Sequence, residues 1–345
     1  MAPEDIVKWT LFVEGIALSV LVVWFLGHGL LLQRYKRWSQ PLLDQAREAL
    51  TVALDNPSRG RELLEPFRKL PIRLQIRLFS ELLPTLSGEQ KQWLTNLGRE
   101  LRLTTRAERQ CRSRLWWRRL RGARLITLLG AREAVMLPLL VDRNPYVRAQ
   151  AAEWAVNRPD AATVDILLAL LSDPDGWCRF AVQDSLLRMG GNVLDRLVVY
   201  LSTHAGHEVK APLQIAINIA DPRLLPPAIT LTRDHISEIR ALAATLLGSL
   251  GGAQATEVLT ALLTDADPAV CASATRALGK LSHWPAAATV ASLLRDQVWE
   301  VRKEAGLALA ALGAPGVLFL NRALKGSDPS AADMARHVLD LTSHA

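Results

Sequence analysis

Apolar side chains recur every three to four residues along most of this chain, as in the series Leu74, Leu78 and Leu82. That spacing places them on one face of a helix with 3.6 residues per turn. Segments in which apolar and polar residues alternate, which is the pattern of a half-buried strand, are hard to find. Alanine, leucine and arginine are abundant and have a low intrinsic cost in helices. The pattern predicts an all-α protein.

The first helix predicted by this pattern is a transmembrane anchor in residues 1–38. Residues 11–32 are apolar apart from Glu14 and His28, and a helix of 22 residues spans a hydrocarbon core of about 30 Å. Acidic residues precede this stretch and Arg34, Lys36 and Arg37 follow it, which by the positive-inside rule places the C-terminal body in the cytoplasm. We therefore expect a single-pass protein of the inner (plasma) membrane with its N-terminus outside. A cleaved signal peptide is disfavoured by the acidic start and the basic exit.

Two ionisable residues, Glu14 and His28, lie inside this predicted span. They are candidates for intramembrane contacts with another span, because unpaired ionisable groups are costly there. The alternative is that both reach the headgroups from near the ends of the helix.

Residues 39–112 are expected to form a helical adaptor segment without an obvious repeat. Helices are predicted for residues 41–54, 58–70, 71–86 and 90–103, and the breaks between them carry proline, glycine, aspartate or serine. This segment separates the anchor from the remainder of the chain.

Arginine is concentrated between residues 99 and 124, where ten arginines stand against two glutamates. This stretch alone is therefore more positive than the whole chain, whose net charge is +7. It predicts contact with an anionic partner: lipid headgroups, a phosphorylated ligand or an acidic protein surface. The alternative is a solvated face whose arginine stems cover apolar surface. The candidate residues are Arg99, Arg102, Arg106, Arg109, Arg112, Arg114, Arg118, Arg119, Arg121 and Arg124.

A repeat of 30 or 31 residues extends over residues 113–345. Each unit carries a turn with Asp, Asn or Pro, a helix rich in alanine and leucine, a break that often contains glycine, and a second apolar helix. A cation recurs at one position of the first helix, while Cys271 and Ala332 replace it in two units. Arg118 stands at the corresponding place before the column, which then comprises Arg148, Arg179, Lys210, Arg240 and Arg302.

The motif D-P-x-V-R-x-x-A resembles the HEAT family, in particular the short bacterial repeats also found in phycobilisome lyases. The resemblance implies an α-solenoid of about seven to eight helix pairs whose inner helices offer a long concave surface. The family also implies that the turn aspartate and the helix arginine bond between neighbouring repeats. The cation column is accordingly expected to be structural, and a ladder of ligand contacts is the alternative.

No catalytic motif, metal-ligand spacing or phosphate-binding loop stands out, and the three cysteines are far apart. We therefore expect no cofactor and no enzymatic activity. The predicted function is a membrane-anchored scaffold whose groove binds a protein partner, for instance in an envelope or polysaccharide-synthesis complex. Nucleic acid is disfavoured because no recognition motif accompanies the arginines. The alternative function, implied by the resemblance to phycobilisome lyases, is a bilin lyase-like enzyme.

Overall fold

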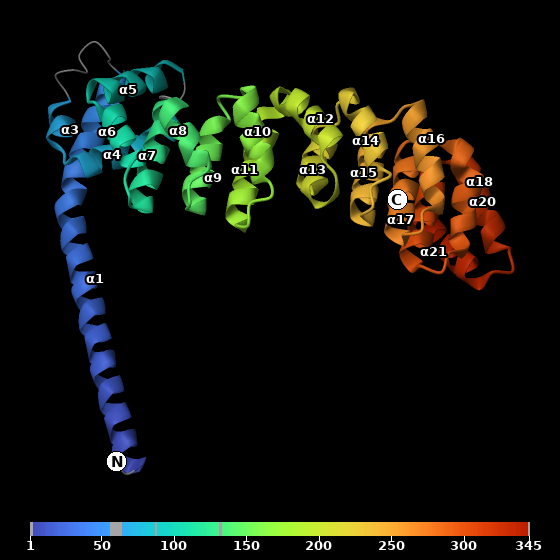
Figure 1. The fold of residues 1–345 in the computed structure, drawn as a ribbon, viewed down its shortest axis with the longest axis horizontal. Coiled ribbons are helices and arrows are strands. Elements are labelled where there is room, and N and C mark those ends of the chain that lie inside the picture. Colours follow the sequence, from blue (N-terminus) through green and yellow to red (C-terminus); the bar gives the residue numbers. More distant parts are fainter. Residues whose placement is uncertain (1–2, 56–63, 87, 131–132, 344–345) are drawn as a thin grey trace. The chain divides into compact units, whose positions relative to one another are not determined.

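The computed structural model describes residues 3–55, 64–86, 88–130 and 133–343, with only the backbone described for residues 3–14, 17, 25–32, 35, 73, 133, 342 and 343. The chain divides into two compact units, residues 1–132 and residues 133–345 (Figure 1). All regular elements in these ranges are helices, as the apolar spacing predicts. The predicted boundary between residues 112 and 113 is not tested by this division and stays a prediction.

Unit 1 begins with one long helix and continues with short ones. The helices are α1 (Pro3–Asp55), α3 (Glu65–Lys69), α4 (Ile72–Leu82), η1 (Leu83–Thr85), α5 (Gly88–Glu100), α6 (Leu103–Cys111) and α7 (Trp116–Leu129).

The prediction of an N-terminal transmembrane helix is wrong. A membrane crossing needs about 20 consecutive, mainly apolar residues in one helix. Within the described part of the chain, no helix combines the required length with sufficient apolar character. The placement as a single-pass protein of the inner membrane rested on that helix and is wrong with it. The side chains of Glu14 and His28, the predicted intramembrane contacts, lie outside the described residues.

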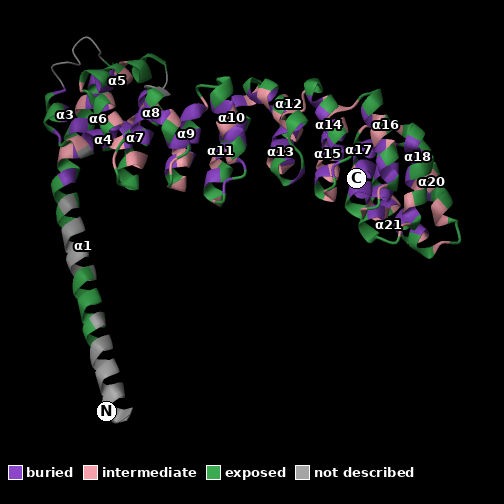
Figure 2. Ribbon diagram, viewed as in Figure 1, coloured by how far each residue is buried: buried purple, intermediate pink, exposed green. Residues whose placement is uncertain are grey.

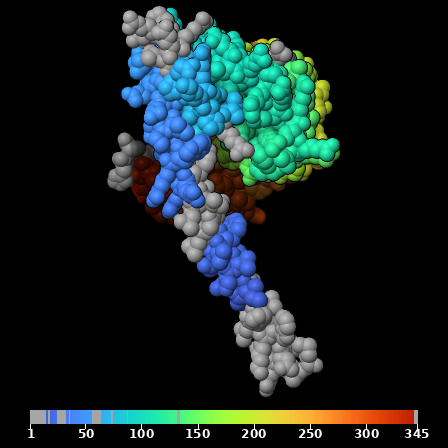
Figure 3. All heavy atoms as spheres, turned by 90° about the vertical axis from the view of Figure 1, so that its left-hand side faces the viewer, coloured from blue at the N-terminus to red at the C-terminus, as the bar shows by residue number. Residues whose placement is uncertain are grey.

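The helix α1 passes without a break through Pro41, so the helix predicted for residues 41–54 is its continuation. Its final turns belong to the core of unit 1, because Leu43, Ala46 and Leu50 are buried against the following helices (Figure 2). The described stretch of α1 from residue 18 to residue 24 lies away from those helices, as Figure 3 shows.

The core of unit 1 is formed by the apolar faces of its short helices. Phe67 of α3 and Phe79 of α4 are fully buried, with ring centroids 5.7 Å apart. Gly98 of α5 lies so close to Phe79 and to Leu129 of α7 that a Cβ atom there would approach a leucine methyl group to 2.7 Å. Close helix packing therefore fixes α7 against α4 and α5.

Unit 2 is a regular series of helix pairs. It comprises α8 (Glu133–Leu140), α9 (Pro145–Ala155), α10 (Ala161–Leu170), α11 (Gly176–Met189), η2 (Gly190–Val193), α12 (Leu194–Thr203), η3 (Gly206–Val209), α13 (Lys210–Ile219), η4 (Pro222–Leu224), α14 (Leu225–Leu231), α15 (Ser237–Leu250), α16 (Ala253–Ala261), η5 (Leu262–Thr264), α17 (Pro268–Lys280), η6 (Trp284–Ala286), α18 (Ala287–Ser292), η7 (Leu293–Arg295), α19 (Trp299–Ala311), α20 (Ala314–Leu324) and α21 (Pro329–Ser343).

These helices form two layers. Odd-numbered helices pack on one another, for example α15 on α17 and α17 on α19, and even-numbered helices line the other side (Figure 1). Small residues allow the close approach: a Cβ atom on Gly248 would lie 2.5 Å from that of Ala277, and one on Gly279 would lie 2.8 Å from Ala308. Each pair buries its apolar face against its neighbours, so the array shares one continuous core.

Candidate anion-binding groove

The arginine-rich segment folds into a helical hairpin made of α6 and α7. The two helices touch at Gly122, where a Cβ atom would lie 2.6 Å from the carbonyl oxygen of Ala107 and 2.8 Å from the backbone nitrogen of Cys111. Only glycine fits this contact without moving one helix. Burial, followed by the charge of Glu108, raises the pKa of the Cys111 thiol to about 12, so it is a neutral packing group. The hairpin is thus a fixed frame for the arginines that it carries.

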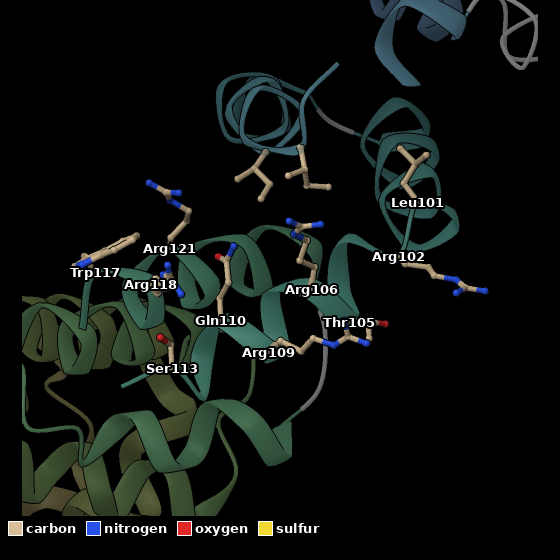
Figure 4. Close-up of a pocket in the computed structure, with 12 residues that line it drawn as sticks. Leu101, Arg102, Thr105, Arg106, Arg109, Gln110, Ser113, Trp117, Arg118 and Arg121 are labelled. Carbon is tan, nitrogen blue, oxygen red and sulfur yellow. The ribbon is translucent and has the colours of Figure 1, made fainter. Parts of the chain in front are cut away.

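A groove of about 930 Å³ lies along this hairpin within unit 1 (Figure 4). Arg106 and Arg109 are three positions apart on α6 and share one face of it, and Arg102 precedes the helix as its N-cap in a left-handed conformation. In Figure 4 the side chains of Arg106 and Gln110 point into the cavity. The residues that line the groove are Ile72, Ile76, Leu101, Arg102, Thr105, Arg106, Arg109, Gln110, Ser113, Trp117, Arg118 and Arg121.

The charge of this groove is unbalanced. Its lining includes five arginines and no carboxylate. Among the described residues, none of these five guanidinium groups forms an ion pair. Arg118 and Arg121 instead lie 5.0 and 5.7 Å from the ring centroid of Trp117. Like charges gathered in a concave surface raise the local positive potential, and a bound anion lowers it.

The groove is also lined by uncharged residues, which are apolar or carry an amide. Ile72 and Ile76 come from α4, about 30 residues before the arginines in the sequence, and supply an apolar surface. The Oε1 atom of Gln110 is buried and accepts no hydrogen bond from the described residues. A buried carboxamide oxygen without a donor is unfavourable. The groove therefore offers cations and an apolar patch to a ligand.

The structure divides the ten predicted arginines between different roles. Arg102, Arg106, Arg109, Arg118 and Arg121 line the groove, and the other five do not. Arg99 bonds to the side chain of Asn96 at 3.2 Å. Arg119 donates to the carbonyl oxygens of Ser113 and Arg114 at 3.0 and 2.9 Å, which closes the turn between α6 and α7. The residues outside the lining are Arg99, Arg112, Arg114, Arg119 and Arg124.

Sequence reasoning pointed to the arginines and noted the adjacent tryptophans but missed the rest of the lining. Gln110 carried no local signal, since glutamine on a helix is usually solvated. Ile72 and Ile76 match any amphipathic helix, so only the packing of α4 against the hairpin brings them to the groove.

Part of the cation column of unit 2 makes contacts that join neighbouring repeats. Nε and Nη2 of Arg148 each lie 2.7 Å from an oxygen of Asp173, which belongs to the next repeat. Burial alone would raise the pKa of Asp173, but the Arg148 guanidinium and the Asp175 N–H outweigh it and hold the pKa below its usual range. Arg240 binds Asp265 in the same way at 2.9 and 2.7 Å. At these two positions the cation joins neighbouring repeats, and the structural role of the whole column stays a prediction.

A second contact recurs within four of the repeats. Nη1 of Arg148 and Nη1 of Arg240 donate to carbonyl oxygens six residues earlier, at 2.6 and 3.0 Å. Arg179 and Arg302 do the same at 2.6 and 2.8 Å. Lys210 has a different partner and pairs with Glu238 at 2.6 Å. The four arginines therefore tie the turn before their own helix to that helix.

The column is interrupted near its C-terminal end. At Cys271 the thiol donates to the carbonyl oxygen of Asp265 at 3.1 Å, where the repeats of Arg148, Arg179, Arg240 and Arg302 use a guanidinium. Asp296, the acid of the following repeat, consequently has no cation partner in the described part of the chain. Further on, Gly326 stands two residues before Asp328, where earlier repeats carry aspartate, and the Nε atom of Arg302 is buried without a partner. The repeats of Cys271 and Arg302 thus lack the arginine–aspartate pair that Arg148 and Arg240 form with the next repeat.

Among the residues whose placement is described, no group of three or more His, Cys, Asp or Glu side chains could hold a metal ion. This absence does not test the expectations that the protein has no cofactor and no enzymatic activity. Both stay predictions.

Comparison with known proteins identifies the repeats. Residues 133–218 and 256–339 match the family model for HEAT repeats. HEAT repeats are therefore found in these two regions of the chain. Both regions lie in unit 2, where the helix pairs and the cation column were found, so the predicted resemblance of the repeat motif is confirmed there. A search among curated proteins gave no match.

Comparison with solved structures gives one superposition above a TM-score of 0.5 and several below it. Importin beta superposes with a TM-score of 0.56 over 89% of this chain at 11% identity, and the chain covers 51% of importin beta. The complex of CpcE and CpcF of phycocyanin lyase from Nostoc gives 0.30 at 18% identity, covering 69% of this chain and 93% of that chain. Human deoxyhypusine hydroxylase in complex with glycerol gives 0.31 at 18%, with 89% and 99% covered. The likeness to importin beta shows a helical solenoid fold.

Proposed function

We propose that this protein is an interaction scaffold whose arginine groove holds an anionic segment of a partner protein. The observation that carries the proposal is the set of five arginines around one groove with no carboxylate among the lining residues. Surface arginines that only solubilise a helix are ordinarily interspersed with acids. The excess found here favours a ligand that supplies the missing negative charge.

The neutral part of the lining favours a polypeptide over a small inorganic anion. Ile72, Ile76 and Leu101 present apolar surface beside the guanidinium groups, and Trp117 adds an aromatic face. A polypeptide segment can place carboxylates on the arginines and apolar side chains on this surface at the same time. Tryptophan and arginine are also enriched where binding energy concentrates in protein interfaces.

The HEAT repeats of unit 2 are consistent with the same role. Arrays of stacked helix pairs bury their apolar faces against each other and leave long surfaces for macromolecular partners. Protein interaction is therefore the function expected of the architecture, and the arginine groove of unit 1 is the part with the most defined chemistry.

The proposal is tested with the full chain and a fluorescein-labelled oligoglutamate peptide in an anisotropy titration. Arg106 and Arg109 are replaced together by glutamate, which we expect to weaken binding at least tenfold, because rows of like charge repel across an interface. The matched control makes the same charge change at Arg112 and Arg114, which lie outside the lining, and should retain most of the affinity. Circular dichroism checks that both variants keep their helices.

Added salt should weaken the interaction, since the Debye length falls from about 10 Å at 0.1 M to about 3 Å at 1 M. If the protein does not bind the peptide at low salt, or if the groove variant and its control lose affinity equally, the groove is not the site that binds the anionic peptide. Single-stranded RNA of similar charge serves as competitor: tighter binding of the RNA would also reject a protein partner.

A further inference from the structure

The junction between α11 and α13 differs from the other junctions between odd-numbered helices of unit 2. These two helices pack on each other less extensively than any other neighbouring pair of odd-numbered helices in that unit. Figure 1 shows more space between their ribbons than between those of α9 and α11. Because a repeat in such an array is stabilised by its nearest neighbours, the resistance to bending is lowest where their contacts are fewest.

The ion pair that joins repeats on either side is missing at this junction. Arg148 binds Asp173, which lies 25 residues further along the chain, and the same spacing recurs at the α15–α17 junction. The corresponding residue for Arg179 is His204, so an imidazole takes the place of the carboxylate. The His204 ring stacks on Tyr200 instead, with centroids 4.0 Å apart. Among the described residues, Arg179 bonds only to backbone carbonyl oxygens of its own turn.

A large apolar side chain also stands here where other repeats pack through a small one. The residue after the column position is alanine in most units, and Ala272 is buried against Val301 of the following helix. In α11 this residue is Phe180, which is 64% exposed. Its ring centroid lies 6.0 Å from that of Trp177, which is 59% exposed. The packing that Ala272 provides at the α17–α19 junction is therefore weakened between α11 and α13.

The even-numbered helices remain joined across the same junction. Arg196 of α12 donates to both carboxylate oxygens of Asp165 in α10, at 2.6 and 2.5 Å. On the other side of α12, Asp195 pairs with Arg223 of η4 at 2.7 Å, just before α14. The helix α12 is thus linked to both of its even-numbered neighbours while the odd-numbered layer is loosely packed. This asymmetry places the pivot of a bending motion in the even-numbered layer.

We infer that unit 2 contains a hinge between α11 and α13. Residues 133–203 form one segment and residues 206–343 the other, and the odd-numbered layer opens and closes between them. The second segment is anchored from its first residue, because the N–H of Gly206 donates to the buried side chain of Asp234 at 2.8 Å. His204 and Ala205 precede this anchor and absorb the change in backbone angles. Bending there alters the curvature of the surface that unit 2 presents to a partner.

The hinge is tested by double electron–electron resonance on the full chain with two pairs of spin labels. The hinge pair joins Glu153→Cys of α9 to Asn218→Cys of α13, and the control pair joins Asn218→Cys to Lys280→Cys of α17. All three positions are exposed, while the natural cysteines are buried, so the labels go to the new thiols. Each pair spans two helix-to-helix steps, which is about 20 Å at about 8–10 Å per step.

We expect the distance distribution of the hinge pair to be at least twofold wider than that of the control pair. His204→Asp combined with Phe180→Ala introduces the residue types found in other repeats. The new carboxylate can accept the Arg179 guanidinium, so the distribution of the hinge pair should narrow to the width of the control pair. The matched control, His207→Asp, adds the same charge at an exposed site three residues later and should leave the width unchanged.

Equal widths for the hinge pair and the control pair would overturn the inference, and that comparison needs no change at the junction itself. An unchanged width in the double variant, with its helix content intact by circular dichroism, would also overturn it, because the named residues would then not loosen the junction. Equal narrowing by His207→Asp would reject the assigned cause in the same way. None of these results bears on the arginine groove of unit 1.

Discussion

The junction between the repeats of α9 and α11 gives the sharpest prediction about stability. The side chains of Arg148 and Asp173 are 12% and 3% exposed and form two bonds of 2.7 Å. Asp173→Asn keeps the size of the side chain but removes its charge, so the guanidinium loses its counter-charge in a poorly solvated site. Breaking a buried pair on one side costs about 3–5 kcal/mol. Because asparagine retains one hydrogen-bond acceptor, we expect the substitution to lower the free energy of unfolding by about 2–4 kcal/mol.

The matched control is Asp184→Asn on α11, the helix that follows the turn containing Asp173. Asp184 pairs with Arg188 at 3.4 Å, and both side chains are more than half exposed, at 54% and 52%. Exposed pairs of this type contribute about 0.5 kcal/mol or less. The same chemical change should therefore have a clearly larger effect at the buried junction.

The thiol of Cys178 is a built-in reporter of this junction. It is fully buried next to the ion pair, and burial, followed by the charge of Asp173, raises its pKa to about 11. Alkylation therefore requires local opening, and a cost of about 3 kcal/mol corresponds to labelling that is faster by about two orders of magnitude. Iodoacetamide labelling read by peptide mass spectrometry measures the rate at this cysteine alone.

Amide hydrogen exchange of α9 and α11 gives a second reading that is independent of thiol chemistry. Equal labelling and exchange rates in Asp173→Asn and Asp184→Asn would refute the idea that the ion pair holds the repeats together. A uniform increase across unit 2 would instead indicate global unfolding.

Three further outcomes follow from the packing. Gly122→Ala should lower the free energy of unfolding of unit 1 by about 1–3 kcal/mol, because its Cβ atom would overlap backbone atoms of α6; Gly191→Ala, which has open space, should be neutral in the same denaturant titration. The bonds from Arg240, opposed by burial, hold the pKa of Asp265 below its ordinary value of 3.8. That contribution is complete above about pH 4 and is lost as the pH falls through the lower folded-state value, so Asp265→Asn should flatten the acid side of a plot of melting temperature against pH. Cys271→Arg should raise the melting temperature, since the new guanidinium can reach the unpaired acid of the following repeat; a lower melting temperature would show that the larger side chain does not fit.

Much of the fold could be predicted from the sequence because its signals are local and repeated. The apolar spacing of Leu74, Leu78 and Leu82 needs only the helical period, and the all-α fold follows from many such series. The repeat was evident because the same turn and cation return at a constant interval, as at Arg148 and Arg240. Each repeat faces the same packing problem, so each retains similar residues at similar positions.

The apolar N-terminal stretch shows where local reasoning failed. A run of apolar residues followed by basic residues is typical of a membrane anchor, but this criterion considers only the composition of a short stretch of sequence. In the structure α1 continues as one helix from Pro3 to Asp55, and its last turns are buried in unit 1. No helix in the described ranges meets the requirements for a membrane crossing.

The candidate site is determined partly by the amino-acid sequence and partly by the tertiary structure. The sequence alone identified an excess of arginine, because charge can be counted along the chain. It could not say which of those arginines share a groove, since that depends on the contact at Gly122 and on the helix α4 that lies far away in sequence. Side chains such as Ile76 and Gln110 become part of a site only when tertiary packing brings separate helices together. The helices and their repeat were therefore set by local sequence, while the groove was decided by the tertiary structure, because a concave surface exists only between elements that pack.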